Sequence, residues 1–139
     1  MDYEPGSSLF ITEPINNLNL RQNMRNFREY DVWKDSLILS KEIFSCTKNF
    51  PKQDPIINQM QRAVISIPSN IAEGASRASS VEFARYLEIA LGSTYELETQ
   101  IELSYVFQYI NIDVYNRIVK DIHSIEKRLT TFINTLRTK

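Results

Sequence analysis

The stretch SIPSNIAEGASRASSVEF (66–83) decides the fold, because it contains a helix end, a short turn and a new helix start. Gly74 is expected to follow the end of the first helix, since glycine takes the left-handed backbone conformation without steric cost. Ser79 then begins the next helix, and Glu82 three residues later completes a capping box. Helices joined by such short connections pack as antiparallel neighbours in a bundle.

Pro68 lies inside the first of these two helices. A proline in a helix interior costs about 3 kcal/mol, because it lacks an N–H group and its ring displaces the carbonyl of Val64. The helix either breaks at Pro68 or bends there and continues. Continuation is favoured because Ile71 stays in helical phase with Val64. A functional alternative is that the freed carbonyl forms a polar spot near Ser66 and Asn70.

Apolar residues spaced three and four apart predict four helices in all. Pro51 closes the first helix, and Asp54 with Pro55 opens the second. The predicted helices lie at about 31–48, 55–73, 80–109 and 112–137. The fold class is therefore all-α, an antiparallel up-down-up-down four-helix bundle over 27–139. Six residues at its seams are expected to be buried: Leu87, Leu91, Ile101, Ile118, Ile125 and Leu129.

Residues 1–26 show no helical period, and they predict a disordered or loosely attached arm. The chain has a formal net charge of -1, which is not the strongly basic balance of most obligate nucleic-acid binders. It shows no signal-peptide pattern, and no apolar run approaches the roughly 18 residues of a membrane span. A cytoplasmic location is the resulting expectation.

The sequence predicts neither an enzyme nor a bound cofactor or metal. Di-iron bundles use a Glu-x-x-His motif, but the chain's one histidine is His123, and Lys120 stands where the glutamate would be. Cys46 lies in an apolar helix-end pattern, which is typical of a small buried hydrophobe rather than a nucleophile. No glycine-rich phosphate loop is present.

Charge is unevenly distributed between the last two helices. The third predicted helix carries Glu88, Glu96, Glu98 and Glu102, whereas the fourth is rich in lysine and arginine. These are either solvated faces or complementary surfaces that orient packing within or between subunits. Arg62 is expected to find its partner among the same glutamates. The residues that we consider for nucleic-acid or anion contact are Arg25, Arg28, Arg77, Arg85, Arg117, Lys120, Lys127 and Arg128.

Three segments resemble the 23S rRNA-intervening-sequence protein family: FREYDVWKDSLILSKEIF (27–44), QMQRAVISIPSNIAEGASR (59–77) and EFARYLEIALGSTYELETQIELSY (82–105). With the final amphipathic helix, the resemblance covers roughly 27–137. The family is named after reading frames inside insertions in bacterial 23S rRNA genes. Its members are similar to the accessory protein of diversity-generating retroelements, a pentameric barrel that binds nucleic acid and a reverse transcriptase. The accessory protein is basic, whereas this chain is near neutral.

The resemblance implies a four-helix bundle, a homopentamer and association with RNA, but no enzyme. The expected function is a non-catalytic oligomeric scaffold or adaptor, which binds a protein or an RNA–protein complex. The alternative is an RNA-binding protein that acts on structured rRNA or its inserted segment. Apolar residues outside the main seams also indicate assembly. These residues are Val32, Trp33, Tyr86, Ile89, Leu103, Phe107, Tyr109, Tyr115, Val119 and Ile133.

Overall fold

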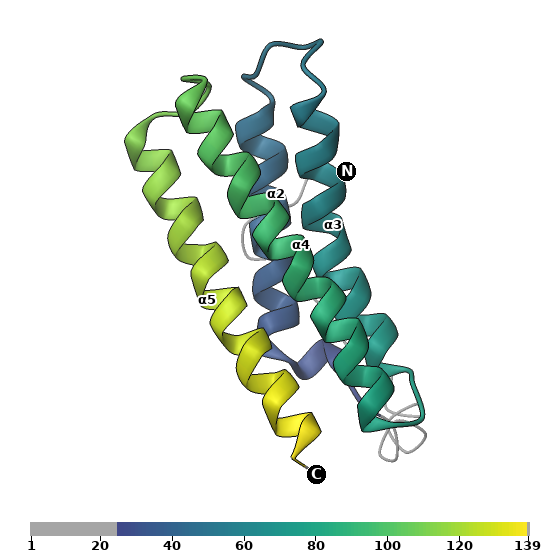
Figure 1. Cartoon of the computed structure of the whole chain (residues 1–139). Coiled ribbons are helices and arrows are strands. Elements are labelled where there is room, and N and C mark those ends of the chain that lie inside the picture. Colours follow the sequence, from purple (N-terminus) through teal and green to yellow (C-terminus); the bar gives the residue numbers. More distant parts are fainter. Residues whose placement is uncertain (1–24, 139) are drawn as a thin grey trace.

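The computed structural model describes residues 25–138, which form a bundle of four α-helices (Figure 1). A short 3-10 helix, η1 (Phe27–Glu29), precedes α2 (Asp31–Thr47), α3 (Ile56–Ala75), α4 (Ser80–Val106) and α5 (Ile112–Arg137). Successive helices run in opposite directions, as Figure 1 shows. Each helix packs against its neighbours in sequence, and α2 also packs against α5. The predicted all-α bundle is confirmed.

The predicted helix bounds are close to those of the structure, and the last helix matches its prediction. The predicted arm lies outside the described residues, apart from Arg25 and Asn26. The Asn26 side chain accepts a hydrogen bond from the backbone N–H of Arg28 and thereby caps η1, an element that the sequence did not predict. None of the helices in the described part of the chain has the length and apolar character that crossing a membrane requires.

The end of α4 was predicted three residues too late. The helix stops at Val106, because Gln108 adopts a left-handed backbone conformation with φ 65°. The backbone N–H of Tyr109 donates to the Ser104 carbonyl at 2.8 Å, and the N–H of Gln108 donates to the Tyr105 carbonyl at 2.9 Å. This pair of bonds is a Schellman motif formed without glycine. A sequence reading that looks for glycine at helix ends does not find it.

The core lies where the apolar seams of the four helices meet. Five of the six predicted core residues are buried, but Leu91 is only partly buried. Its neighbour Ala90 takes the inward position, and one residue along a helix turns the side chain by about 100°.

The prediction that Val32 and Trp33 lie outside the core, as apolar residues of an assembly surface, is wrong. Both are buried, and the Trp33 ring packs against Phe27 of η1 with centroids 5.1 Å apart.

Helix α3 continues through Pro68, as expected. Because Pro68 cannot donate to the Val64 carbonyl, this oxygen accepts a long hydrogen bond from the Ser40 hydroxyl of α2 at 3.5 Å. The polar contacts of Ser66 and Asn70 do not include this freed carbonyl, so the alternative of a polar spot around it is not borne out. Ser66 accepts hydrogen bonds from Asn70 at 2.9 Å and from Ser93 of α4 at 2.8 Å.

Gly74 does not have the predicted role. It lies inside α3, which ends at Ala75, and its φ is not in the left-handed region. A Cβ atom at this position would lie 2.7 Å from Cβ of Tyr86 and 2.9 Å from Cδ1 of Phe83. Glycine is therefore needed for the close approach of α3 and α4.

The predicted cap of α4 is confirmed in part, because the Ser79 hydroxyl accepts a hydrogen bond from the backbone N–H of Glu82 at 3.2 Å.

The first prediction concerns Gly74. Gly74→Ala should lower the free energy of unfolding by about 1–3 kcal/mol, because the added methyl group overlaps α4. Gly92→Ala is the matched control, since Gly92 lies in α4 and no atom outside its own stretch of helix lies within 4 Å of its Cβ position. The control should stabilise the chain by up to about 1 kcal/mol through helix propensity. Urea unfolding measures both, and equal effects would contradict the close contact.

The second prediction uses the two adjacent leucines of α4. Leu87→Ala should lower the free energy of unfolding by about 2–5 kcal/mol, because Leu87 is fully buried and its truncation leaves a cavity. Leu91→Ala should cost clearly less, because Leu91 only borders the core. Thermal unfolding of the two variants side by side tests the assignment. A larger drop in melting temperature for Leu91→Ala than for Leu87→Ala would mean that α4 is rotated relative to the described packing.

Candidate functional site

The eight basic residues singled out in the sequence fall into two groups. The first group, Arg25, Arg28, Arg77 and Arg85, belongs to the segment at η1, the turn between α3 and α4, and the first turns of α4. The start of α2 and the α3–α4 turn lie at the same end of the bundle (Figure 1). Arg117, Lys120, Lys127 and Arg128 lie along α5. The structure therefore does not bring all eight into one surface.

Arg25 and Arg77 are held by contacts within the bundle. Nη1 of Arg25 donates to the carbonyl oxygen of Arg77 at 2.5 Å, and its guanidinium lies 5.0 Å from the centre of the Phe83 ring. Nη2 of Arg77 donates to Glu73 at 2.9 Å and to the Tyr86 hydroxyl at 2.7 Å. The Arg77 guanidinium also lies 4.6 Å from the centre of the Tyr86 ring. These two arginines stabilise the α3–α4 corner.

The other two arginines at this end differ in their surroundings. The Arg28 guanidinium lies 5.9 Å from the Trp33 ring, over the start of α2. Arg85 is exposed and lines a groove of about 250 Å³ together with Arg77 and Tyr86. Arg85 is therefore the residue of this group that is best placed to contact an anion outside the chain.

The basic side chains of α5 also differ in their surroundings, because some form ion pairs within the bundle and others are exposed. Arg128 pairs with Asp35 of α2 at 2.7 Å, and Arg117 lies 3.9 Å from Glu42 of α2. Arg137 contacts Glu88 of α4. Among these pairs, only Arg137 with Glu88 joins α5 to a carboxylate of α4, which is the pairing that the sequence suggested, whereas Arg117 and Arg128 contact α2 instead. Lys120 and Lys127 are exposed on the outer side of α5.

Arg62 does not form the expected ion pair with a glutamate of α4 within residues 25–138. It lines a groove of about 380 Å³ between α3 and α4, and Glu96 lines the same groove. The hydroxyl groups of Ser66 and Ser93 meet there at 2.8 Å. The hydroxyl groups of Ser66 and Ser93 thus link α3 to α4, and the charged side chains of Arg62 and Glu96 line the groove beside them.

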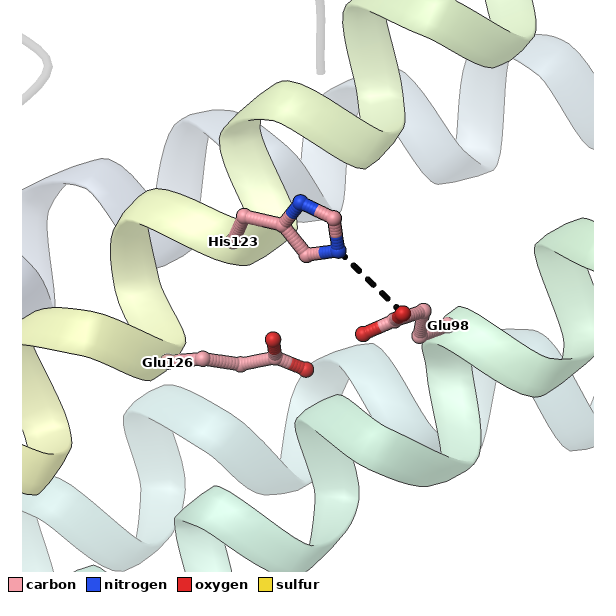
Figure 2. Close-up of side chains that lie close together, drawn as sticks. All are labelled: Glu98, His123 and Glu126. Atoms are coloured by element: carbon pink, nitrogen blue, oxygen red, sulfur yellow. Dashed lines mark hydrogen bonds and ion pairs between the residues drawn. The ribbon is translucent and has the colours of Figure 1, made fainter.

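A cluster of three potential metal ligands lies between α4 and α5. It consists of Glu98 from α4 with His123 and Glu126 from α5 (Figure 2). One ligand atom of each residue lies within 4.8 Å of the other two. Nε2 of His123 is 3.2 Å from Oε2 of Glu98. Figure 2 shows that the three side chains converge on one space, with the two carboxylates facing each other.

Two carboxyl groups this close do not ionise independently. Burial is the main cause that raises the pKa of Glu126 to about 7, and its hydrogen bond with Glu98 raises this pKa further. The same hydrogen bond is the main cause that lowers the pKa of Glu98, and the contact with His123 also lowers it. The pair therefore titrates as one unit with a shared proton.

This cluster was not predicted from the sequence. The Glu-x-x-His motif of di-iron bundles is absent, and the chain has the reverse order, His123-x-x-Glu126. Either order places both side chains on one face of a helix, because residues three apart are neighbours there. The third member, Glu98, joins them through the packing of α4 against α5, so the motif alone does not identify it.

Cys46 does not have the surroundings of a nucleophile. It lines a cavity of about 440 Å³ with Glu42, Tyr109 and Arg117, near the end of α2 and the start of α5. Burial raises the pKa of the Cys46 thiol to about 11, and the nearby Glu42 adds to this. The thiol is therefore protonated at neutral pH, and the reactive thiolate is scarce. This agrees with the expectation that Cys46 is not catalytic.

Exposed apolar residues form an interrupted stripe along the outward face of α4, with exposed Arg85, Glu88 and Thr99 on the same face between them. The stripe consists of Val81, Tyr95, Leu103 and Val106, with exposed fractions of 40–72%. Their spacings are close to multiples of 3.6 residues, so they share one face. Gly92 lies on the same face, and open space surrounds its Cβ position. Phe107 and Ile112 continue the apolar surface past the end of the helix.

The stripe agrees only partly with the apolar residues expected at an assembly surface. Exposed members of that set are Ile89, Leu103 and Phe107. Partly buried members are Tyr86, Tyr109, Tyr115 and Val119. Ile133 is buried, so its expected surface role is wrong: it packs into the core with Leu129 and Leu136 of the same helix face.

Comparison with known proteins identifies the family. Residues 28–131 match the family model described as 23S rRNA-intervening sequence protein. The chain belongs to this family. The matched region of the 23S rRNA-intervening sequence protein includes Gly74, the α4 stripe and the Glu98–His123–Glu126 cluster.

A solved structure supports the assignment. It is a crystal structure of a protein of unknown function from the S23 ribosomal protein family of Bacteroides thetaiotaomicron. That protein is 30% identical to the present family member, with a TM-score of 0.69. The match covers 73% of this chain and 97% of the other. The comparison with curated proteins finds no match.

The third prediction separates the structural arginine from the exposed one. Arg77→Ala should lower the free energy of unfolding by about 1 kcal/mol, because it removes the ring contact and the hydrogen bond to Tyr86. Arg85→Ala should change it by less than about 0.5 kcal/mol, as is usual for exposed side chains. Urea unfolding gives both values. If Arg85→Ala is the more damaging change, the contacts described at this corner are not the ones that stabilise it.

Proposed function

We propose that this 23S rRNA-intervening sequence protein is a non-catalytic scaffold that works as a homo-oligomer. The observation that carries the proposal is the α4 stripe, because a row of large apolar side chains on one helix usually marks an interface. The protonated Cys46 thiol disfavours this residue as a nucleophile. We place the scaffold in the bacterial cytoplasm.

A second copy of the chain is the occupant that best fits the stripe. The exposed side of α4 carries the carboxylates Glu82 and Glu96 beside one arginine, Arg85, whereas the outer side of α5 carries exposed Lys120 and Lys127. Contact between α4 of one copy and α5 of the next would join opposite charges around an apolar centre. Such a contact uses two different surfaces, so it forms a ring where the rotation between copies closes and an open filament where it does not. The resemblance to the pentameric accessory protein of retroelements favours five members.

The fourth prediction tests the scaffold by its mass. Light scattering behind a sizing column, at micromolar concentration, should give about five times the 16.2 kDa of one chain. Leu103→Glu combined with Val106→Glu should reduce the mass to that of one chain, because charge replaces apolar contact on the stripe. Both residues are exposed, so circular dichroism should remain that of the native bundle.

Ser69→Glu is the control for added charge. Ser69 is exposed on α3, away from the stripe, and its hydroxyl donates to the carbonyl of Ile65 in the same helix. This variant should keep the mass of the unmodified protein. A single-chain mass for the unmodified protein would overturn the scaffold proposal. A mass of another small oligomer would retain the scaffold and correct the number of subunits.

The alternative function is binding of structured RNA. The family's description supports it, and so does the groove in which exposed Arg85 lies next to the Tyr86 ring. Arginine with an aromatic ring is a common arrangement for contacting phosphate and bases. Labelled structured rRNA should then bind in the micromolar range, more weakly at high salt and more weakly to Arg85→Ala. No binding at low salt would remove this alternative and leave the scaffold.

A further inference from the structure

We propose that Glu98, His123 and Glu126 bind a divalent first-row transition-metal ion, of which Zn²⁺ is the representative, between α4 and α5. Each of the three residues supplies one ligand atom. The ion would join the two helices at about the middle of each. The proposal does not depend on the oligomeric state, because all three ligands come from one chain.

The chemistry of the ligands selects the class of ion. Two carboxylate oxygens with one imidazole nitrogen form a mixed set that suits zinc and its first-row neighbours. Calcium and magnesium prefer oxygen ligands alone, so the histidine disfavours them. Three protein ligands leave one position of a tetrahedral site open. His123 and Glu98 are partly exposed, with side-chain exposures of 56% and 30%, so water can complete the site.

The geometry is close to that of a metal site. Zinc–ligand distances of about 2.0–2.1 Å place two ligands of a tetrahedral ion about 3.3 Å apart. Nε2 of His123 and Oε2 of Glu98 are already 3.2 Å apart. The remaining ligand atoms lie within 4.8 Å, a gap that small rotations of the Glu126 side chain can close.

Glu126 provides an independent indication. Its Oε2 atom is buried and accepts no aligned hydrogen bond within residues 25–138, although the carboxyl group as a whole interacts with Glu98 and with the Thr94 hydroxyl. Buried polar atoms are normally satisfied, and a buried carboxylate oxygen without an aligned donor is a free ligand for a cation. Within residues 25–138, no lysine or arginine forms an ion pair with Glu98 or Glu126. A bound cation would supply the charge that the two facing carboxylates lack.

An ordinary surface ion pair between His123 and Glu98 is the competing explanation. It accounts for the contact of 3.2 Å, and a proton shared with Glu98 would then satisfy Glu126. It also predicts that added metal does not change the melting temperature of the protein. The two explanations therefore differ in what the protein does when zinc is added.

The fifth prediction is tested with the untagged, chelator-treated full chain. Isothermal titration with Zn²⁺ at neutral pH should give one ion per chain. Replacing Zn²⁺ by Co²⁺ should give visible absorption bands typical of an ion with few ligands. The melting temperature should rise with Zn²⁺ and remain unchanged with the same concentration of Mg²⁺.

Variants assign the site to these residues. His123→Ala and Glu126→Gln should each weaken Zn²⁺ binding by at least about tenfold and abolish the cobalt bands. Cys46→Ser and Glu102→Gln are the controls, and both should bind as the unmodified protein does. Glu102 is an exposed carboxylate on α4, bonded to Tyr115 and outside the cluster. Circular dichroism checks that each variant is folded.

Three outcomes would overturn the proposal. The first is the absence of Zn²⁺ binding to the folded, unmodified chain. The second is binding that survives His123→Ala, which removes the chain's one histidine. The third is binding that disappears in Cys46→Ser, which would assign the metal to the thiol instead. Each result can be read whether or not the chain forms an oligomer.

Discussion

The close contact of α3 with α4 at Gly74 is the constraint on which the bundle depends. The backbone of α3 comes so near to α4 that a methyl group at Gly74 would lie 2.7 Å from Cβ of Tyr86. This proximity occurs at the short turn, where the two helices are also joined covalently. Farther along the same interface, the hydroxyl groups of Ser66 and Ser93 meet at 2.8 Å. Small side chains thus keep the two helices close over much of their length, and dense packing of this kind is what fixes helix positions.

The position of α4 then determines which surfaces are available. Its inward side fills the core, and its opposite side presents the α4 stripe. A helix at the corner of a four-helix bundle can bury only part of its circumference, so the large apolar residues on the far side remain exposed. Apolar groups in that position are better explained by a partner than by the stability of one chain. The same feature of α4 therefore connects the fold to the proposed scaffold.

The ion pairs of α5 orient the helix more than they stabilise the bundle. Arg117 and Arg128 of α5 contact carboxylates of α2, and exposed ion pairs of this kind contribute little to stability. They help to set the orientation of α5 against α2. Between α4 and α5 the situation is reversed, because two carboxylates face each other beside His123. A site that brings like charges together needs a proton or a cation, whereas the neighbouring ion pairs need neither.

The sequence by itself determined the class of fold, the four helices and most of the core. Helical period shows which residues face inward, and local signals such as Ser79 show where a helix begins. These properties depend on residues a few positions apart. Only the tertiary structure decided the role of Gly74, the partial exposure of Leu91 and the partners of the arginines. It also joined Glu98 to His123, 25 residues away. The physical reason is that contacts between helices depend on how each helix is rotated and shifted against its neighbour, and no local pattern contains this information.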